Sequence, residues 1–113
     1  MIMSSGSQAM GDNYEWQNVT MEAAFQPRDG AGALVYKDAM YLVGGWSRDR
    51  THFPRICRND VWRSRDGLAW EMIKPNTFID NRFDSAADWE GRHTAGYVVF
   101  QDRIWIAGPI SRN

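Results

Sequence analysis

The amino-acid sequence predicts an all-β fold built from antiparallel strands. Short runs rich in β-branched and aromatic residues recur along the 113 residues, and links that contain Asp or Gly separate them. A 19-residue stretch that begins at Pro27 is also repeated without a gap 64 residues later, from Gly91. No run of ten residues keeps the apolar spacing of an amphipathic helix.

Each copy of the repeat contains two strand-like runs joined by a two-residue link. The links are Lys37-Asp38 in the first copy and Gln101-Asp102 in the second. Because Asp tolerates a left-handed backbone, both links suit the primed turns that connect hairpins. The aligned pairs are Arg28 with Arg92, Gly32 with Gly96, Val35 with Val99, Asp38 with Asp102, Tyr41 with Trp105 and Gly44 with Gly108.

Between the copies, Asp66-Gly67 predicts a further hairpin. We therefore expect four consecutive strands at about 33–37, 40–44, 59–64 and 69–73, and two more at about 94–100 and 103–107. A strand at about 16–19 precedes them, and residues 1–13, rich in Ser and Gly, are expected to form a flexible lead-in. The expected arrangement is one antiparallel meander of seven strands.

Composition excludes several classes of partner. The formal charge of −1 gives no field that would attract nucleic acid or anionic lipid. No apolar run approaches the ~18 residues that predict a membrane span. The lone Cys57 has no second thiol for a disulfide or a metal knuckle. We expect no nucleic-acid or membrane partner, no metal and no cofactor.

The repeated residues resemble the kelch repeat of β-propellers. The kelch pattern places an Arg before the first strand, an aromatic residue in the second, a Gly-Gly doublet after it and a Trp in the fourth. The matching residues are Arg28, Tyr41, Gly44, Gly45 and Trp70, and then Arg92, Trp105 and Gly108 in the second copy. Pro109 and Asp29 depart from the pattern.

Residues 59–70 are similar to a variant found in bacterial propellers related to the central domain of galactose oxidase, and less closely to the Asp-box of sialidases. The resemblance implies that Arg28 and Arg92 bind loop carbonyls or carboxylates between blades. It also implies that Tyr41 and Trp70 pack between adjacent sheets.

Under this resemblance, residues 14–113 hold about two four-stranded blades. They comprise the last strand of one blade, one full blade at about 28–73 and half a blade at about 91–109. Two blades cannot close a ring, because propellers have ~4 to 8. We therefore expect a partial propeller, completed by further blades of a longer chain or by a homo-oligomer.

The long loops 45–58 and 74–93 are expected on the side of the sheet opposite the tight turns. Their local charges are +3 between residues 46 and 58 and −3 between residues 76 and 91, so the loops can pair with each other. Alternatively, their aromatic and charged side chains form a surface that stacks on a sugar or holds a peptide. The candidate ligand-binding residues are Trp46, Arg48, Arg50, Trp89 and Glu90.

The expected function is a non-catalytic scaffold that binds a protein or a glycan. His52 and His93 are isolated in sequence and Ser64 has no evident base, so no catalytic residues are predicted. The alternatives are a fragment of a sugar-acting propeller enzyme of the sialate-epimerase or sialidase-like kind, and a self-assembling structural unit. In the enzyme alternative, Asp84, Asp88 and Glu90 could provide the acid and the base.

Overall fold

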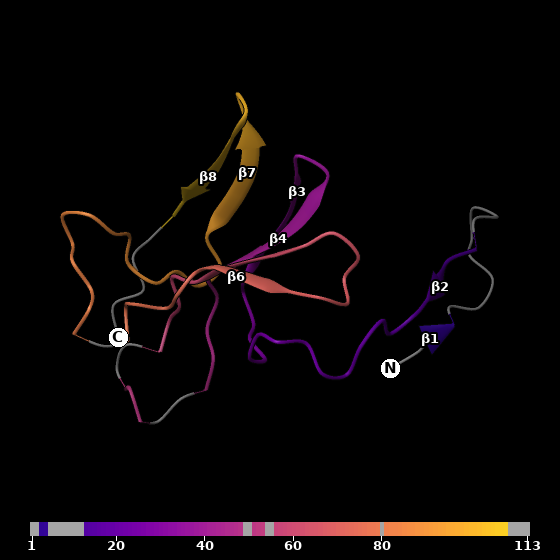
Figure 1. Cartoon of the computed structure of the whole chain (residues 1–113), viewed down its shortest axis with the longest axis horizontal. Coiled ribbons are helices and arrows are strands. Elements are labelled where there is room, and N and C mark those ends of the chain that lie inside the picture. Colours follow the sequence, from indigo (N-terminus) through magenta and orange to yellow (C-terminus); the bar gives the residue numbers. More distant parts are fainter. Residues whose placement is uncertain (1–2, 5–12, 49–50, 54–55, 80, 109–113) are drawn as a thin grey trace.

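The computed structural model describes residues 3–4, 13–48, 51–53, 56–79 and 81–108. In these residues all regular elements are strands and there is no helix, which confirms the all-β class. Figure 1 shows two larger sheets and, apart from them, a short N-terminal pair of strands. The strands are β1 (Met3–Ser4), β2 (Glu15–Trp16), β3 (Gly32–Tyr36), β4 (Ala39–Val43), β5 (Val61–Ser64), β6 (Glu71–Lys74), β7 (Gly96–Phe100) and β8 (Arg103–Ala107).

The strands do not form the single meander of seven strands that the sequence predicted, and they divide into separate antiparallel sheets. The first larger sheet has four strands in the order β3-β4-β5-β6, and the second is the β7-β8 hairpin. Six of the predicted strands are therefore present at shifted bounds. The strand expected from residue 59 begins only at Val61, because Asn59 and Asp60 turn their side chains to loop residues and to Arg28. The strand expected from residue 69 begins at Glu71, after a capped turn.

The strand predicted at 16–19 is wrong beyond Trp16. Strand β2 is Glu15–Trp16, and it pairs with Met3–Ser4, inside the segment expected to be a flexible lead-in. The side chain of Asn18 accepts a hydrogen bond from the Thr20 amide (3.2 Å), and the Thr20 hydroxyl accepts one from the amide of Glu22 (3.0 Å). Such local side-chain bonds favour turns over a strand ladder.

The two hairpin turns of the repeat have the predicted backbone. The φ angles are 47° at Lys37 and 58° at Asp38, and 51° and 56° at Gln101 and Asp102. Positive φ at both central residues defines the turn whose twist matches that of the flanking strands. The aligned links therefore fold in the same way, 64 residues apart.

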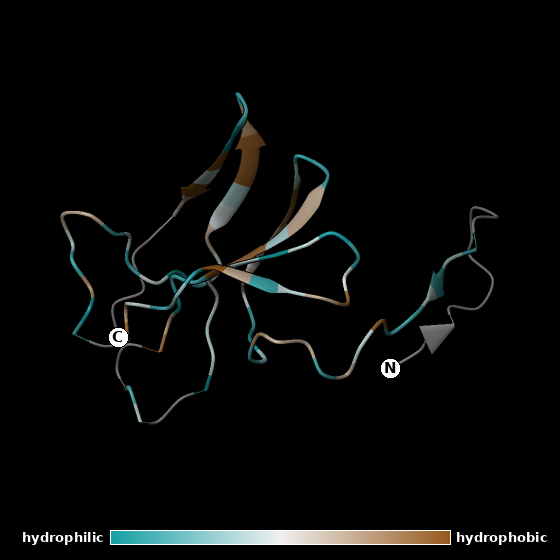
Figure 2. Cartoon of the chain, viewed as in Figure 1, coloured by the Kyte–Doolittle hydropathy of each residue, from teal (hydrophilic) through white to brown (hydrophobic). Residues whose placement is uncertain are grey.

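The two larger sheets pack against each other through β3 and β7. The ring of Tyr97 lies directly over Gly32, where a Cβ atom would come within 2.3 Å of the ring. At the tips, the Tyr36 hydroxyl donates to the carbonyl of Asp102 (2.8 Å), and Lys37 lies 3.5 Å from the Asp102 carboxylate. In Figure 2 the hairpin β7-β8 carries apolar residues over much of its length.

A backbone junction, made by Gly45, Arg58 and Arg92, holds the ends of both sheets together. The Gly45 amide donates to the Arg92 carbonyl (2.8 Å), the Arg92 amide to the Arg58 carbonyl (3.1 Å) and the Arg58 amide to the Gly45 carbonyl (2.8 Å). Gly45 has a φ of 101°, which suits glycine at this close approach of three chain segments.

The two aligned arginines make equivalent contacts. Arg28 donates to the carbonyl of Gly44 (3.0 Å), and Arg92 donates to the carbonyl of Gly108 (3.5 Å). Arg28 also forms a two-pronged pair with Asp60, at 2.7 and 3.0 Å. The acceptors are carbonyls and a carboxylate, as the resemblance implied. Each acceptor, however, adjoins the same sheet as its arginine, so these bonds do not join the two sheets.

The aromatic side chains expected between sheets have nearer partners. The ring of Trp70 meets that of Phe25 edge-on at 5.0 Å, and Tyr41 meets Tyr36 at 5.9 Å. Phe25 also contacts Trp62 at 6.2 Å. The segment before β3 therefore covers the outer part of the first sheet.

Candidate functional site on the long-loop face

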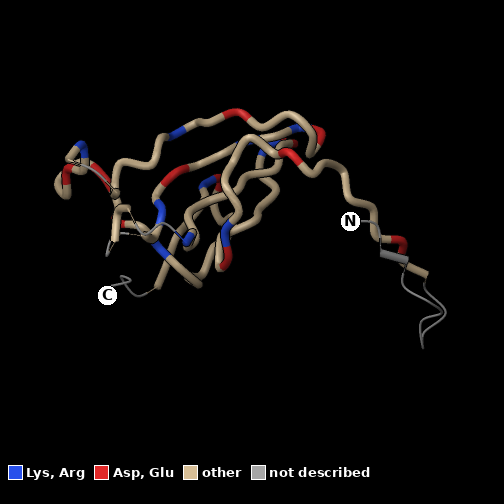
Figure 3. The backbone as a smooth tube through the Cα atoms, turned by 90° about the horizontal axis from the view of Figure 1, so that it is seen from below, with Lys and Arg blue, Asp and Glu red and all other residues tan. Residues whose placement is uncertain are grey.

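The loops 45–58 and 74–93 extend from one end of the sheets. In Figure 1 they lie below and to the left, while the tips of the hairpins β3-β4 and β7-β8 point to the top. Lysine, arginine, aspartate and glutamate residues are interspersed along the chain in Figure 3, without one region of a single sign. No region of a single charge therefore marks this face among the described residues.

Trp46 is fixed by a short backbone pairing with Asp29. Its amide donates to the Asp29 carbonyl (2.9 Å) and its carbonyl accepts from the Asp29 amide (3.0 Å). The half-buried indole lies beside His93, with ring centroids 6.4 Å apart, and His93 Nε2 is 2.9 Å from Asp29 Oδ1. Asp29 and His93 occupy aligned positions of the two repeat copies, and an alignment shows equivalence and not contact, so no sequence signal indicated that they are neighbours.

Arg48 lines a pocket of about 450 Å³ together with Gln26, Pro27 and Ser47. The buried Arg58 supports this wall, because its guanidinium donates to the Ser47 hydroxyl (2.6 Å) and to the Gln26 side-chain carbonyl. Arg48 itself is exposed and supplies a positive charge at the pocket. The sequence analysis missed Gln26 and Pro27, which lie outside both long loops.

Trp89 belongs to a second cluster, organised by the fully buried Asn59, and the half-buried Glu90 follows Trp89 in the chain. The Asn59 side chain accepts from the Thr77 amide (2.9 Å) and donates to the Trp89 carbonyl (2.9 Å). Lys74 Nζ lies 5.6 Å from the centroid of the Trp89 ring. No ring contact joins Trp89 to Trp46 among the described residues, and Arg50 lies outside them.

Asp88 is held as a carboxylate in this cluster. Burial alone would raise its pKa, but hydrogen bonds from Thr77 and Lys74 outweigh that effect and lower the pKa below the ordinary value. Lys74 Nζ is 3.1 Å from Asp88 Oδ2. In the loop 74–93, Asp88 thus pairs with Lys74 at the start of the same loop. An aspartate held in the charged form is also poorly suited to act as a general acid.

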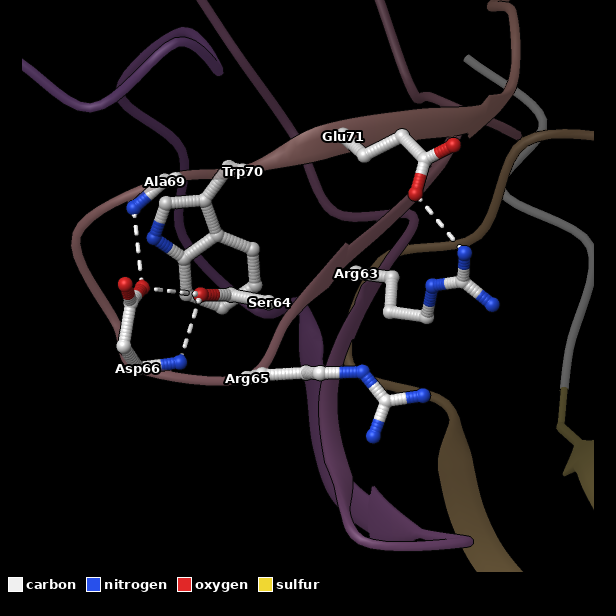
Figure 4. Close-up of a pocket in the computed structure, with 7 residues that line it drawn as sticks. All are labelled: Arg63, Ser64, Arg65, Asp66, Ala69, Trp70 and Glu71. Atoms are coloured by element: carbon white, nitrogen blue, oxygen red, sulfur yellow. Dashed lines mark hydrogen bonds and ion pairs between the residues drawn. The ribbon is translucent and has the colours of Figure 1, made fainter.

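A second pocket of about 330 Å³ lies at the β5-β6 hairpin (Figure 4). Its polar groups largely bind one another. Asp66 Oδ1 accepts from the amides of Leu68 (2.9 Å) and Ala69 (3.0 Å), and Trp70 Nε1 donates to the Gly67 carbonyl (2.9 Å). These bonds cap the turn, so we assign this pocket to the stability of the hairpin.

The fold and site define an all-β protein of antiparallel sheets with a polar, aromatic-edged loop face. Comparison of the chain with protein-family models, with curated proteins and with solved structures finds no match. In the part of the chain that the structure describes, no helix is long and apolar enough to cross a bilayer. The same residues contain no group of three or more His, Cys, Asp or Glu side chains arranged to hold a metal ion.

Proposed function

We propose that the chain is a segment of a kelch-type β-propeller, similar to the propeller domain of galactose-oxidase-like bacterial proteins, and that it serves as a non-catalytic binding scaffold. The equivalent geometry of the two repeat copies supports the first part. Both have a turn with two positive φ angles and an arginine bound to the carbonyl of the glycine sixteen residues later.

The pocket at Arg48 is the observation that carries the binding function. It offers a guanidinium, a side-chain amide and a hydroxyl on a wall that Arg58 holds in place. Trp46 adjoins this wall in the chain and presents a half-buried indole. Donor groups beside an aromatic edge suit a glycan or a peptide that carries carboxylates.

Ligand binding tests this proposal. The chain should bind ligands immobilised on glycan or peptide arrays. Arg48→Ala should lower the affinity for a bound ligand at least about tenfold, because a charge-assisted hydrogen bond contributes roughly 1.5–3 kcal/mol. The double variant Trp46→Ala, Trp89→Ala should weaken it further if both clusters touch the ligand. Arg65→Ala, in the β5-β6 hairpin away from the long loops, is the matched control and should bind as the wild type does.

Two results would contradict the proposal. One is the absence of any retained ligand from a folded, correctly associated sample. The other is equal binding by the wild type and by all of the loop variants.

A further inference from the structure

Two apolar sheet faces lie exposed on opposite sides of the packed pair of sheets. The first, named here the Val98 face, is formed by β7 and β8, in which Val98 pairs with Trp105 and Phe100 with Arg103. Val98 is 52% exposed, Phe100 59% and Trp105 44%. Tyr97 and Val99 alternate with these residues and face the first sheet.

The second, named here the Val35 face, belongs to β3 and β4. Ala33 pairs with Leu42 and Val35 with Met40 on this side, and Val35 is 69% exposed. Phe25 covers the continuation of this face at Trp62, but the β3 edge at Ala33 and Val35 stays open. Gly32 alternates with these residues and lies under Tyr97, on the other side of the sheet.

The internal repeat relates these two faces to the interface that already exists. A shift of 64 residues carries Ala33 and Val35 onto Tyr97 and Val99, the side of β7 that packs on β3. The same shift carries Leu34 and Tyr36, on the opposite side of β3, onto Val98 and Phe100. A further unit that packed on the second sheet as the second sheet packs on the first would therefore place its Val35 face against the Val98 face.

We propose that the Val98 face binds the Val35 face of a second copy of this chain, in a head-to-tail arrangement. This inference rests on the proposal that the two sheets are successive units of one array. A single copy cannot join its own two faces, because they point away from each other on either side of the β3-β7 interface. The contact is heterologous, so each copy can bind one neighbour on each side.

Polar groups at the hairpin tips agree with this arrangement. Inside the chain, Lys37 pairs with Asp102 across the interface. The same packing between copies places the amide of Gln101 against Asp38 of the second copy, a donor against a carboxylate. No pair of like charges arises at that point, and both side chains are exposed in the single chain.

Complementary variants test the arrangement. Val35→Glu blocks one face and Val98→Glu blocks the other, because either change would bury a charge in an apolar contact, and the two blocked faces would also repel each other. The wild-type chain should sediment above its monomer mass of 13.0 kDa, in a concentration-dependent manner, and each variant alone should sediment at 13.0 kDa. An equimolar mixture of both variants should form a dimer, because each contributes its intact face.

The control is Leu68→Arg, which places a charge on an exposed apolar residue of the β5-β6 hairpin and should associate as the wild type does. Near-UV circular dichroism checks that each variant is folded, and Val35→Ser with Val98→Ser replaces any charged variant that is not. A wild type that stays monomeric at all concentrations would overturn the inference. So would a mixture of variants that stays monomeric, or association that neither substitution reduces.

The outcome is separable from that of the binding proposal. A monomer that still retains a ligand through Arg48 would overturn only the head-to-tail contact. A head-to-tail assembly whose loops retain no ligand would overturn only the binding function.

Discussion

At the scale of single residues, the aligned arginines have the same backbone acceptor but different electrostatic surroundings. The side chains of Arg28 and Asp60 are each only 3% exposed, and Asp60 Oδ2 also accepts a hydrogen bond from Trp62 Nε1 (2.8 Å). Arg92 has a longer contact with a carbonyl, and that contact is exposed. Removing Arg28 therefore leaves a buried carboxylate without its countercharge, whereas removing Arg92 does not.

The variant Arg28→Ala should lose about 3–5 kcal/mol of unfolding free energy, the range for breaking a buried ion pair. The matched variant Arg92→Ala should lose about 1 kcal/mol, the net value of one hydrogen bond. Urea unfolding followed by tryptophan fluorescence measures both. Equal losses in the two variants would show that the pair with Asp60 contributes little.

At the scale of elements, the β5-β6 hairpin depends on the Asp66 side chain. The backbone amides of Ala69 and Leu68 donate to its carboxylate, and they lower the pKa of Asp66 below the ordinary value of 3.8. Ser64 Oγ accepts from the Gly67 amide (2.8 Å) in the same turn. The turn is thus closed by side chains in addition to its backbone geometry.

A carboxylate whose pKa is lowered on folding stabilises the folded state above its unfolded pKa, and that contribution disappears as the pH falls through the folded value. Asp66→Asn should therefore be less stable than the wild type at neutral pH. The difference should shrink once the pH falls below the ordinary Asp pKa of about 4, and it should vanish only below the lowered pKa of the folded state. Thermal unfolding across this pH range measures the difference. Asp38→Asn, in another hairpin turn, is the control, and a difference between wild type and Asp66→Asn that does not change with pH would exclude this role of Asp66.

At the scale of the whole molecule, stability depends on how the two larger sheets pack. Few apolar side chains are buried in the described residues; they are Ala39, Val43, Cys57 and Phe78. The Tyr97 ring lies over Gly32, where β3 and β7 pack against each other. Burial also raises the pKa of the Tyr97 hydroxyl.

Gly32→Ala should weaken this packing, because the new Cβ atom would lie 2.3–2.7 Å from three atoms of the Tyr97 ring. The expected loss is about 1–3 kcal/mol, the usual cost of overpacking. Gly96→Ala is the matched control at the aligned position, where a Cβ atom would meet only the Ala107 carbonyl, at 3.3 Å. Denaturant unfolding compares them, and an equal loss in both would contradict this role of Tyr97.

The sequence predicted the regular parts of this fold because local chemistry determines them. The two-residue links and the Asp66-Gly67 turn each carry a short-range signal, and the 64-residue repeat indicates that the links form the same turn; the structure contains these turns. The strand at 16–19 was wrong beyond Trp16 because the side chains of Asn18 and Thr20 accept hydrogen bonds from nearby backbone amides, which favours a turn.

The candidate site was less predictable because tertiary contacts assemble it. Arg48 was identified from its loop, but its pocket is completed by Gln26 and Pro27, which lie just before and at the start of the first repeat copy and outside both long loops. Trp46 and Trp89 were expected to act together, yet they contact His93 and Lys74 respectively. The kelch-type architecture and the ligand stay predictions.

The junction at Gly45, Arg58 and Arg92 is made of main-chain amides and carbonyls. Such bonds do not depend on side-chain identity, except where the positive φ of Gly45 requires glycine. The residues of both loops beyond the junction are therefore free to diversify without separating the sheets. Under the proposed binding function, substitutions in the loops would change the ligand while the backbone junction keeps the two sheets together.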